Sequence, residues 1–91
     1  MYIKITAKKW FQTSYGNTYH SCLVERISGE GTGYKSEMIG YEPFTYGYGD
    51  QYIDTAAKIL CISYQELQTD IRDHPGRYCI FATNVNRKKD L

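Results

Sequence analysis

Two histidines and three cysteines are the residues whose types suit covalent or metal chemistry. His20 and Cys22 are two positions apart, so on a strand both side chains point to the same face. An imidazole beside a thiol is the pairing that activates a cysteine nucleophile. No signature of a cysteine or serine hydrolase surrounds the pair. We therefore interpret Cys22 as a buried thiol beside a surface histidine, and we expect no enzyme activity and no catalytic residue.

Metal and cofactor binding have equally little support in the sequence. Tetrahedral zinc takes cysteine and histidine ligands, and a C-x2-C pair is what makes such a site recognisable. The cysteines are instead widely spaced, and the apolar surroundings of Cys61 and Cys79 predict core positions. The close glycines within 29–33 lack the strand–helix context of a phosphate-binding loop and indicate a hairpin loop. We expect no metal and no cofactor.

Tyrosine is the most distinctive residue type of the chain. Ten of the 91 residues are tyrosine, and several gather with glycine between positions 41 and 52. Tyrosine offers a large amphipathic contact area at low conformational cost, so binding surfaces are rich in it. The alternative is that a small sheet uses tyrosine rings to cover the margin of its core. We predict a partner-binding surface that comprises Tyr41, Phe44, Tyr46, Tyr48 and Tyr52.

Charge is unevenly distributed, although the net charge is only +1. Residues 1–12 and residues 77–91 each carry +3, and the stretch between them carries −5. If the two ends meet in the fold, they form one positive patch that attracts an anionic partner. Basic residues beside aromatic ones suit stacking on single-stranded nucleic acid, and they equally suit a lysine-guarded edge strand. The predicted basic patch contains Lys8, Lys9, Trp10, Arg87, Lys88 and Lys89.

The elements that must position these residues begin with strands. Residues 2–11 alternate between apolar and polar side chains, which is the period-two pattern of a half-buried strand. A turn cluster at 14–17 separates them from a second β-rich stretch at 18–28, so the two stretches predict a hairpin. A third strand is expected within 34–46, where Pro43 favours an edge position or a bend.

Helical signals follow the third strand. Asp50 suits the N-cap of a helix that opens at Gln51. Residues 63–66 fit the capping-box pattern S-x-x-E, which predicts the start of a second helix that ends at Pro75. The apolar spacing keeps helical phase through both segments, so one continuous helix is the alternative to the two that we favour.

The order of these elements predicts the fold class. A last strand is expected at 78–85 and a basic tail at about 86–91. The order β-β-β-α(α)-β predicts an α+β fold, a small antiparallel sheet with one or two helices packed on one face. The length predicts a single domain, 1–91, in which the first and last strands are neighbours.

Cellular location is inferred from what the sequence lacks. No apolar run approaches the length of a membrane helix, and the first residues alternate rather than form a signal peptide. Three widely spaced cysteines do not predict a disulfide framework. We expect a cytoplasmic protein with reduced thiols and no membrane partner.

Four short motifs resemble those of small bacteriophage and prophage proteins to which no activity is assigned: K-W-F at 9–11, Y-G-N-T-Y-H-S at 15–21, Y-G-Y-G-D-Q-Y at 46–52 and R-K-K-D-L at 87–91. The resemblance implies an accessory protein in the cytoplasm of a bacterial host and carries over no catalytic residue. Many such proteins, anti-CRISPR proteins among them, block a host defence complex. We expect a non-enzymatic protein that binds a host protein or protein–nucleic acid complex. The alternative is a small nucleic-acid-binding module that uses the basic and aromatic terminal segments. The sequence leaves the target and the oligomeric state open.

Overall fold

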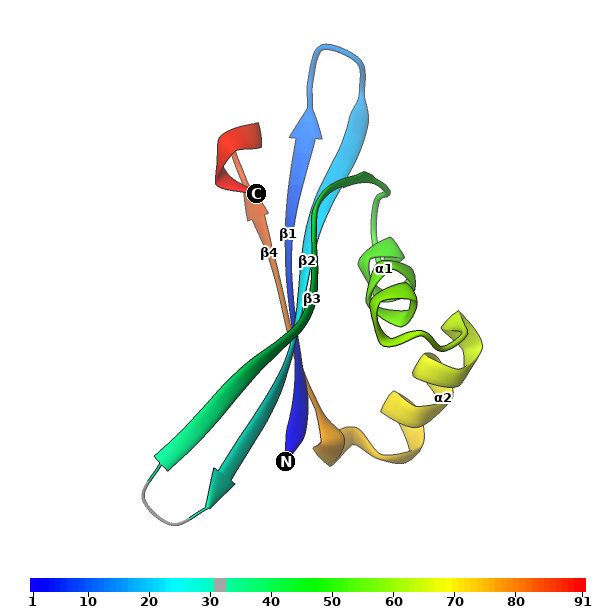
Figure 1. Cartoon of the computed structure of the whole chain (residues 1–91). Helices are drawn as coiled ribbons and strands as arrows, with labels where there is room; N and C mark the ends of the chain where they lie inside the picture. The colour runs from blue at the N-terminus through cyan, green and yellow to red at the C-terminus, as the bar shows by residue number, and fades with distance from the viewer. Residues whose placement is uncertain (31–32) are drawn as a thin grey trace.

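The computed structural model describes residues 1–30 and 33–91, and it confirms the α+β order of elements (Figure 1). The strands are β1 (Tyr2–Gln12), β2 (Asn17–Glu30), β3 (Gly33–Tyr46) and β4 (Tyr78–Val85). The helices are α1 (Gln51–Leu60) and α2 (Tyr64–Asp73), and the short 3-10 turns η1 (Pro75–Arg77) and η2 (Lys88–Asp90) flank β4. The centre of the hairpin loop expected at 29–33 lies outside the described residues.

The four strands form one sheet in the order β3-β2-β1-β4. β1 pairs antiparallel with β2, and β2 pairs antiparallel with β3, as the hairpin signals predict. The expectation of an antiparallel sheet is wrong for β4, which runs parallel to β1. The helices return the chain to the end of the sheet at which β1 begins, so β4 starts there and runs in the same direction (Figure 1). The sheet is therefore mixed.

Both helices lie on one face of this sheet, as expected (Figure 1). The alternation of β1 turns Ile5 and Ala7 toward the helices, and the register of β2 places Val24 and Cys22 opposite them. All four side chains are fully buried. They pack with apolar residues of α1 and with Leu67 of α2 in one core cluster.

The two helices are separate, and Cys61 marks the break between them. Its backbone is left-handed, with φ of 60°, and its N–H bonds back to carbonyls of the last turn of α1. This cap leaves the thiol exposed, so the core position expected for Cys61 is wrong. Ser63 caps α2 as predicted, because its hydroxyl accepts a 3.0 Å bond from the Glu66 N–H. Asp50 precedes α1 but makes no side-chain cap bond.

The first and last strands are neighbours, so the two basic ends of the chain meet. After β4 the chain turns onto the sheet face opposite the helices, where Figure 1 places η2. No helix among residues 1–30 and 33–91 has the length and apolar character that crossing a membrane requires.

Candidate binding surface

The face of the sheet that the helices leave uncovered is called the open face here. On β1 it carries the residues that alternate with Ile5 and Ala7, including Thr6, Lys8 and Trp10. The strand register places Trp10 opposite Tyr19 of β2, and Tyr19 opposite Tyr46 of β3. Aromatic side chains from three adjacent strands therefore lie side by side on this face.

A β-bulge brings further residues of β3 onto the open face. His20 pairs with Thr45 and Cys22 pairs with Glu42, so two steps along β2 correspond to three along β3. Strict alternation would place Tyr41 and Tyr46 on opposite faces, because five positions separate them. The extra residue restores their phase, and Tyr41 lies opposite Leu23 on the same face as Tyr46.

The aromatic rings on this face stack on one another and form a row that consists of Trp10, Tyr19, Phe44 and Tyr46. The Trp10 and Tyr19 centroids are 5.9 Å apart, and those of Tyr19 and Phe44 are 4.6 Å apart with an angle of 15° between the planes. Tyr46 meets Tyr19 edge to face at 5.7 Å. Phe44 is 39% exposed and Tyr46 is 58% exposed, so the row borders solvent.

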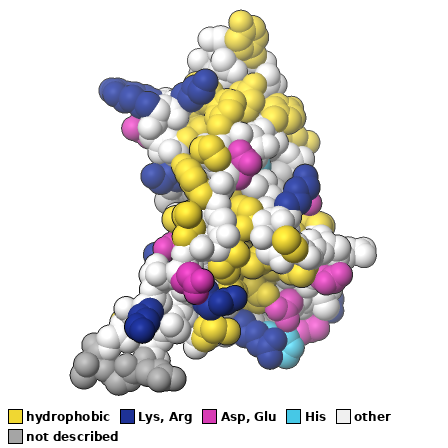
Figure 2. Space-filling view, in the orientation of Figure 1, with side chains coloured by type: hydrophobic (Ala, Val, Ile, Leu, Met, Phe, Trp, Pro, Cys, Tyr) yellow, Lys and Arg dark blue, Asp and Glu magenta, His cyan; other side chains and the backbone are white. Residues whose placement is uncertain are grey.

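Lysines flank the aromatic side chains of the open face. The Lys88 ammonium lies 4.8 Å from the Phe44 ring centroid, and the Lys4 ammonium lies 5.6 Å from that of Phe81. Both distances fall within cation–π range. Figure 2 shows hydrophobic side chains gathered along the region of β3, with basic side chains above them near η2.

Other members of the predicted sites lie elsewhere. Lys9 belongs to the helix face of β1, where its ammonium lies 5.9 Å from the Tyr52 ring. Tyr52 is 9% exposed and belongs to the core, so it cannot serve the predicted contact surface. Tyr48 is exposed in the loop before α1. Arg87 and Lys89 are exposed beside Lys88.

A shallow cavity of about 260 Å³ lies on the open face. Tyr41, Leu23 and Met38 give it an apolar side, and Lys8 lies at its margin. Leu91 also lines it, so the C-terminal segment reaches from the edge of β4 across to the β2–β3 side. The tail is thus part of this surface rather than a free extension.

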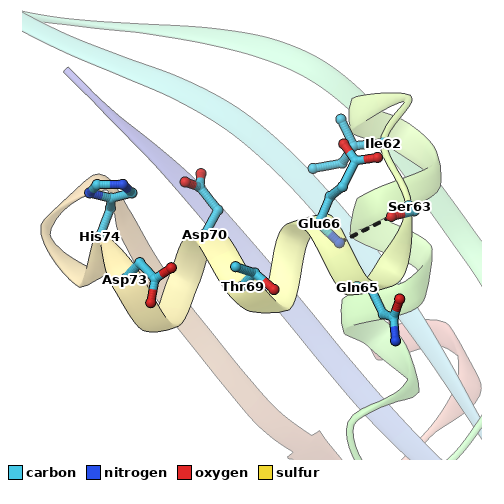
Figure 3. Close-up of a pocket in the computed structure, with 8 residues that line it drawn as sticks. All are labelled: Ile62, Ser63, Gln65, Glu66, Thr69, Asp70, Asp73 and His74. Carbon is cyan, nitrogen blue, oxygen red and sulfur yellow. Dashed lines mark hydrogen bonds between the residues drawn. The ribbon is translucent and has the colours of Figure 1, made fainter.

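A second hollow, of about 940 Å³, lies along α2 and has the opposite charge (Figure 3). Glu66, Asp70 and Asp73 line it together with His74. Asp70 accepts a hydrogen bond from the Tyr78 hydroxyl and lies 3.7 Å from Arg77. Burial, with the hydrogen bond and charge of Asp70, raises the pKa of Tyr78 to about 12. No cluster of three metal-ligating side chains occurs among the described residues.

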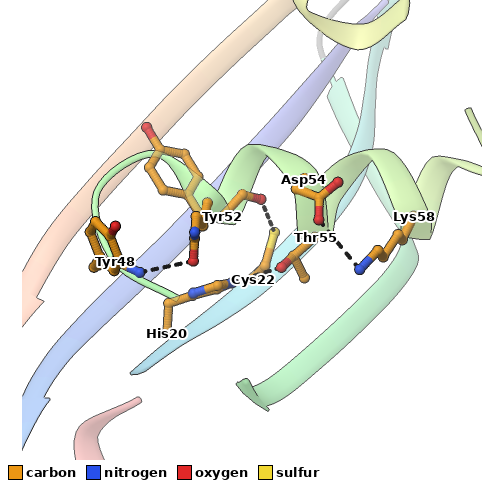
Figure 4. A network of polar contacts seen from close by, with 8 residues as sticks. His20, Cys22, Tyr48, Tyr52, Asp54, Thr55 and Lys58 are labelled. Carbon is orange, nitrogen blue, oxygen red and sulfur yellow. Dashed lines mark hydrogen bonds and ion pairs between the residues drawn. The ribbon is translucent and has the colours of Figure 1, made fainter. Parts of the chain in front are cut away.

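His20 is 1% exposed, so the expectation of a surface histidine is wrong. Its Nδ1 lies 3.2 Å from the Gly47 carbonyl oxygen, and its Nε2 lies 2.7 Å from the Thr55 hydroxyl (Figure 4). A carbonyl only accepts, so Nδ1 carries the proton and Nε2 accepts from Thr55. A side chain on Gly47 would lie 2.9 Å from the imidazole. The imidazole therefore ties β2 to α1 and to the loop before it.

Cys22 does not form the nucleophilic pair with His20 that their spacing suggests. Both side chains lie on the same face, as predicted, and that face is the one under the helices, where the Cys22 thiol donates to the Tyr52 carbonyl at 3.7 Å (Figure 4). Burial raises the pKa of Cys22 to about 11, so the group remains a thiol at neutral pH.

Three open-face residues escaped the sequence predictions: Tyr19, Met38 and Phe81. The turn occupies 13–16, one residue earlier than the predicted cluster at 14–17, and this register is what places Tyr19 opposite Trp10. Met38 and Phe81 have no such local signal, since their face depends on the β3 bulges and on the pairing of β4.

Comparison of the chain with protein-family models, with curated proteins and with solved structures finds no match.

Proposed function

We propose that this protein is a non-enzymatic accessory protein of the bacteriophage type, which acts in the bacterial cytoplasm and binds a host protein through the open face. The observation that carries the proposal is the aromatic row, on the sheet face that α1 and α2 leave uncovered. Tyr41, Met38 and Phe81 extend the exposed apolar area around it, at 48%, 65% and 51% exposure. Protein interfaces are enriched in these residue types, and the rest of a protein surface is not.

The charge of the open face defines the partner's chemistry. Lys4, Lys8 and Lys88 stand among the aromatic side chains. A complementary partner presents apolar side chains at its centre and acidic side chains at its rim. The acidic hollow along α2 lies on the helix side of the molecule, so its charge does not repel an acidic partner on the open face.

Ring orientation favours a protein over a nucleic acid. Bases stack on ring faces, so a platform for them needs faces that are free. Here Tyr19 stacks between Trp10 and Phe44, and Lys88 covers the Phe44 ring. The ring faces between Tyr19 and Phe44, and the Phe44 ring beside Lys88, are thus already in contact within the protein, and the tyrosine hydroxyls of the row suit hydrogen bonds with a protein partner.

The resemblance of the sequence to small phage proteins supports a host defence complex as the partner. A protein of this size inhibits such a complex by covering a surface that the complex needs. The surface of this protein is large enough for one standard interface of about 800 Å² per partner.

Paired variants test this function. Phe44→Ala removes the ring that Tyr19 and Lys88 contact, and Tyr64→Ala on α2 removes a ring of nearly equal exposure, 39% against 40%. A host protein captured by the wild type is purified, and its affinity for both variants is measured by calorimetry. We expect Phe44→Ala to weaken binding at least about 10-fold, as at an interface hot spot, and Tyr64→Ala to bind like the wild type.

Two results would contradict the proposal. One is equal affinity of the Phe44→Ala variant and the wild type for every captured protein. The other is sub-micromolar binding of a single-stranded oligonucleotide that persists as the salt concentration rises to the physiological range. Such persistence would favour the nucleic-acid alternative, because phosphate contacts weaken steeply with salt and base stacking does not.

A further inference from the structure

The outer edge of β3 offers a second interaction surface, separate from the aromatic row. β3 is an edge strand, and its first half belongs to the hairpin that projects beyond the helices (Figure 1). Residues 34–38 are all exposed, Tyr34 at 84% and Met38 at 65%. An exposed edge strand presents unpaired backbone groups to another strand. Pro43 and both irregularities of the β2–β3 pairing lie beyond Met38, so the edge within 34–38 is regular and its protection is the charge of Lys35 and Glu37.

We propose that a second copy of this chain pairs antiparallel with this edge, with Ser36 on the two-fold axis. In a symmetric antiparallel pair the two-fold axis must lie between the two copies of one residue. Hydrogen-bonded and non-hydrogen-bonded residue pairs alternate along the strands, so an axis between successive residues would make one kind of pair equivalent to the other. An axis at Lys35 or at Glu37 would place like charges opposite each other. An axis at Ser36 places Lys35 opposite the partner's Glu37, and symmetry makes this favourable pair twice.

The same register also gives each of the two large apolar side chains of the segment an apolar contact across the interface. With Ser36 on the axis, Tyr34 lies opposite the partner's Met38, again twice. A thioether at the edge of an aromatic ring is a favourable contact. The Tyr34 ring lies over Gly29 of its own hairpin, where an added Cβ would lie 2.7 Å from it, and at 84% exposure it has most of its surface free for a partner.

Existing contacts leave the charges available for this pairing. The Glu37 carboxylate lies 3.8 Å from Arg26, and both side chains are about half or more exposed. Among the ion pairs of the described residues, none involves Lys35. In the dimer Lys35 therefore gains a partner, and Glu37 lies between two cations.

The dimer joins two four-stranded sheets into one continuous sheet and leaves the aromatic rows free. The segment is short, so the contact is smaller than a standard interface of about 1,600 Å² and we expect a weak dimer, with a dissociation constant of about 10–100 μM. Met38 belongs to both surfaces, but the dimer leaves the rings of the aromatic row uncovered, so the inference does not depend on what that row binds.

Charge reversal tests the register. In sedimentation experiments on the full chain, we expect Lys35→Glu alone and Glu37→Lys alone each to weaken dimerisation at least about 10-fold, because each places like charges opposite each other twice. An equimolar mixture of the two variants restores association as a heterodimer, since position 35 of each chain then faces an opposite charge at position 37 of the other. The control Arg72→Glu reverses an exposed charge on α2 and dimerises like the wild type.

Association of the mixture shows that both variants are folded, and circular dichroism of each variant alone confirms the fold for the case in which the mixture does not associate. The inference is overturned if the wild type remains monomeric up to about 500 μM, well above the expected dissociation constant. It is equally overturned if either single variant dimerises like the wild type, or if the mixture fails to associate.

Discussion

The two faces of the sheet are built from the same strands and differ in what their side chains contact. On the helix face Ile5, Ala7, Cys22 and Val24 are fully buried. On the open face aromatic and apolar side chains remain partly exposed although they alternate with that core along the same strands. The two faces of the sheet therefore have different roles. Burial under the helices stabilises the fold, and the open face supplies contact area that the fold itself does not require.

One truncation on each face measures how much each face contributes to stability. Ile5→Ala leaves a cavity at a fully buried site, and we expect a loss of about 2–5 kcal/mol in the free energy of unfolding. Phe81→Ala removes a larger side chain that is 51% exposed, and we expect a loss of about 1 kcal/mol or less. Urea denaturation followed by circular dichroism measures both. Equal losses would mean that the open face also belongs to the structural core.

A smaller effect depends on pH and on the buried thiol. The pKa of Cys22 is raised from 9.0 to about 11 by burial, so the unfolded chain loses this proton first. The contribution of Cys22 to stability is therefore fully present below pH 9 and is lost as the pH rises through 11. We expect the wild type to lose more stability between pH 8.5 and pH 11 than Cys22→Ala does, as measured by urea denaturation at each pH.

The Cys22→Ala variant is the matched control because the tyrosines with raised pKa values remain in it. Burial also raises the pKa of Tyr52 and of Tyr78, so both proteins lose some stability at high pH. Only the difference between them reports Cys22. Parallel pH profiles would show that the thiol titrates normally in the folded protein.

The starts of the two helices differ in whether a side chain caps them. Ser63→Ala removes the hydroxyl that caps Glu66 of α2, and we expect a loss of about 1 kcal/mol. Asp50→Ala removes a side chain that makes no cap bond, and we expect almost no change. Thermal unfolding of the two variants, side by side, ranks them. A larger loss for Asp50→Ala would indicate that its charge near the start of α1 matters more than a direct bond.

Local signals in the sequence were sufficient for most element boundaries. Alternation around Ile5 predicted β1 and its buried face, Ser63 predicted the start of α2, and residues 78–85 formed the predicted last strand. The direction of β4 was not predictable from its own residues. A strand has the same alternation whichever way it runs, and the direction is set by where the helices end.

The candidate site was predictable only in part, for the same reason. Tyr41, Phe44 and Tyr46 were named from composition and lie on the open face, but Tyr52 belonged to the helical phase of Ile53 and Ala56 and is buried with them. The burial of His20 depends on Gly47 and Thr55, which are 27 and 35 positions away. Contacts at that distance leave no pattern in a local stretch of sequence.

The parallel pairing of β1 with β4 bears on the order in which the protein folds. Ile3 pairs with Tyr78, 75 positions later, whereas the two hairpins join residues that are near in the chain. Closing a long loop costs more conformational entropy, so the hairpins form early and β4 docks last, after the helices have brought it to the sheet. Until then the edge of β1 is bare and able to pair with another nascent chain. When β4 docks, it pairs with the exposed edge of β1 and so removes a site at which folding chains could aggregate.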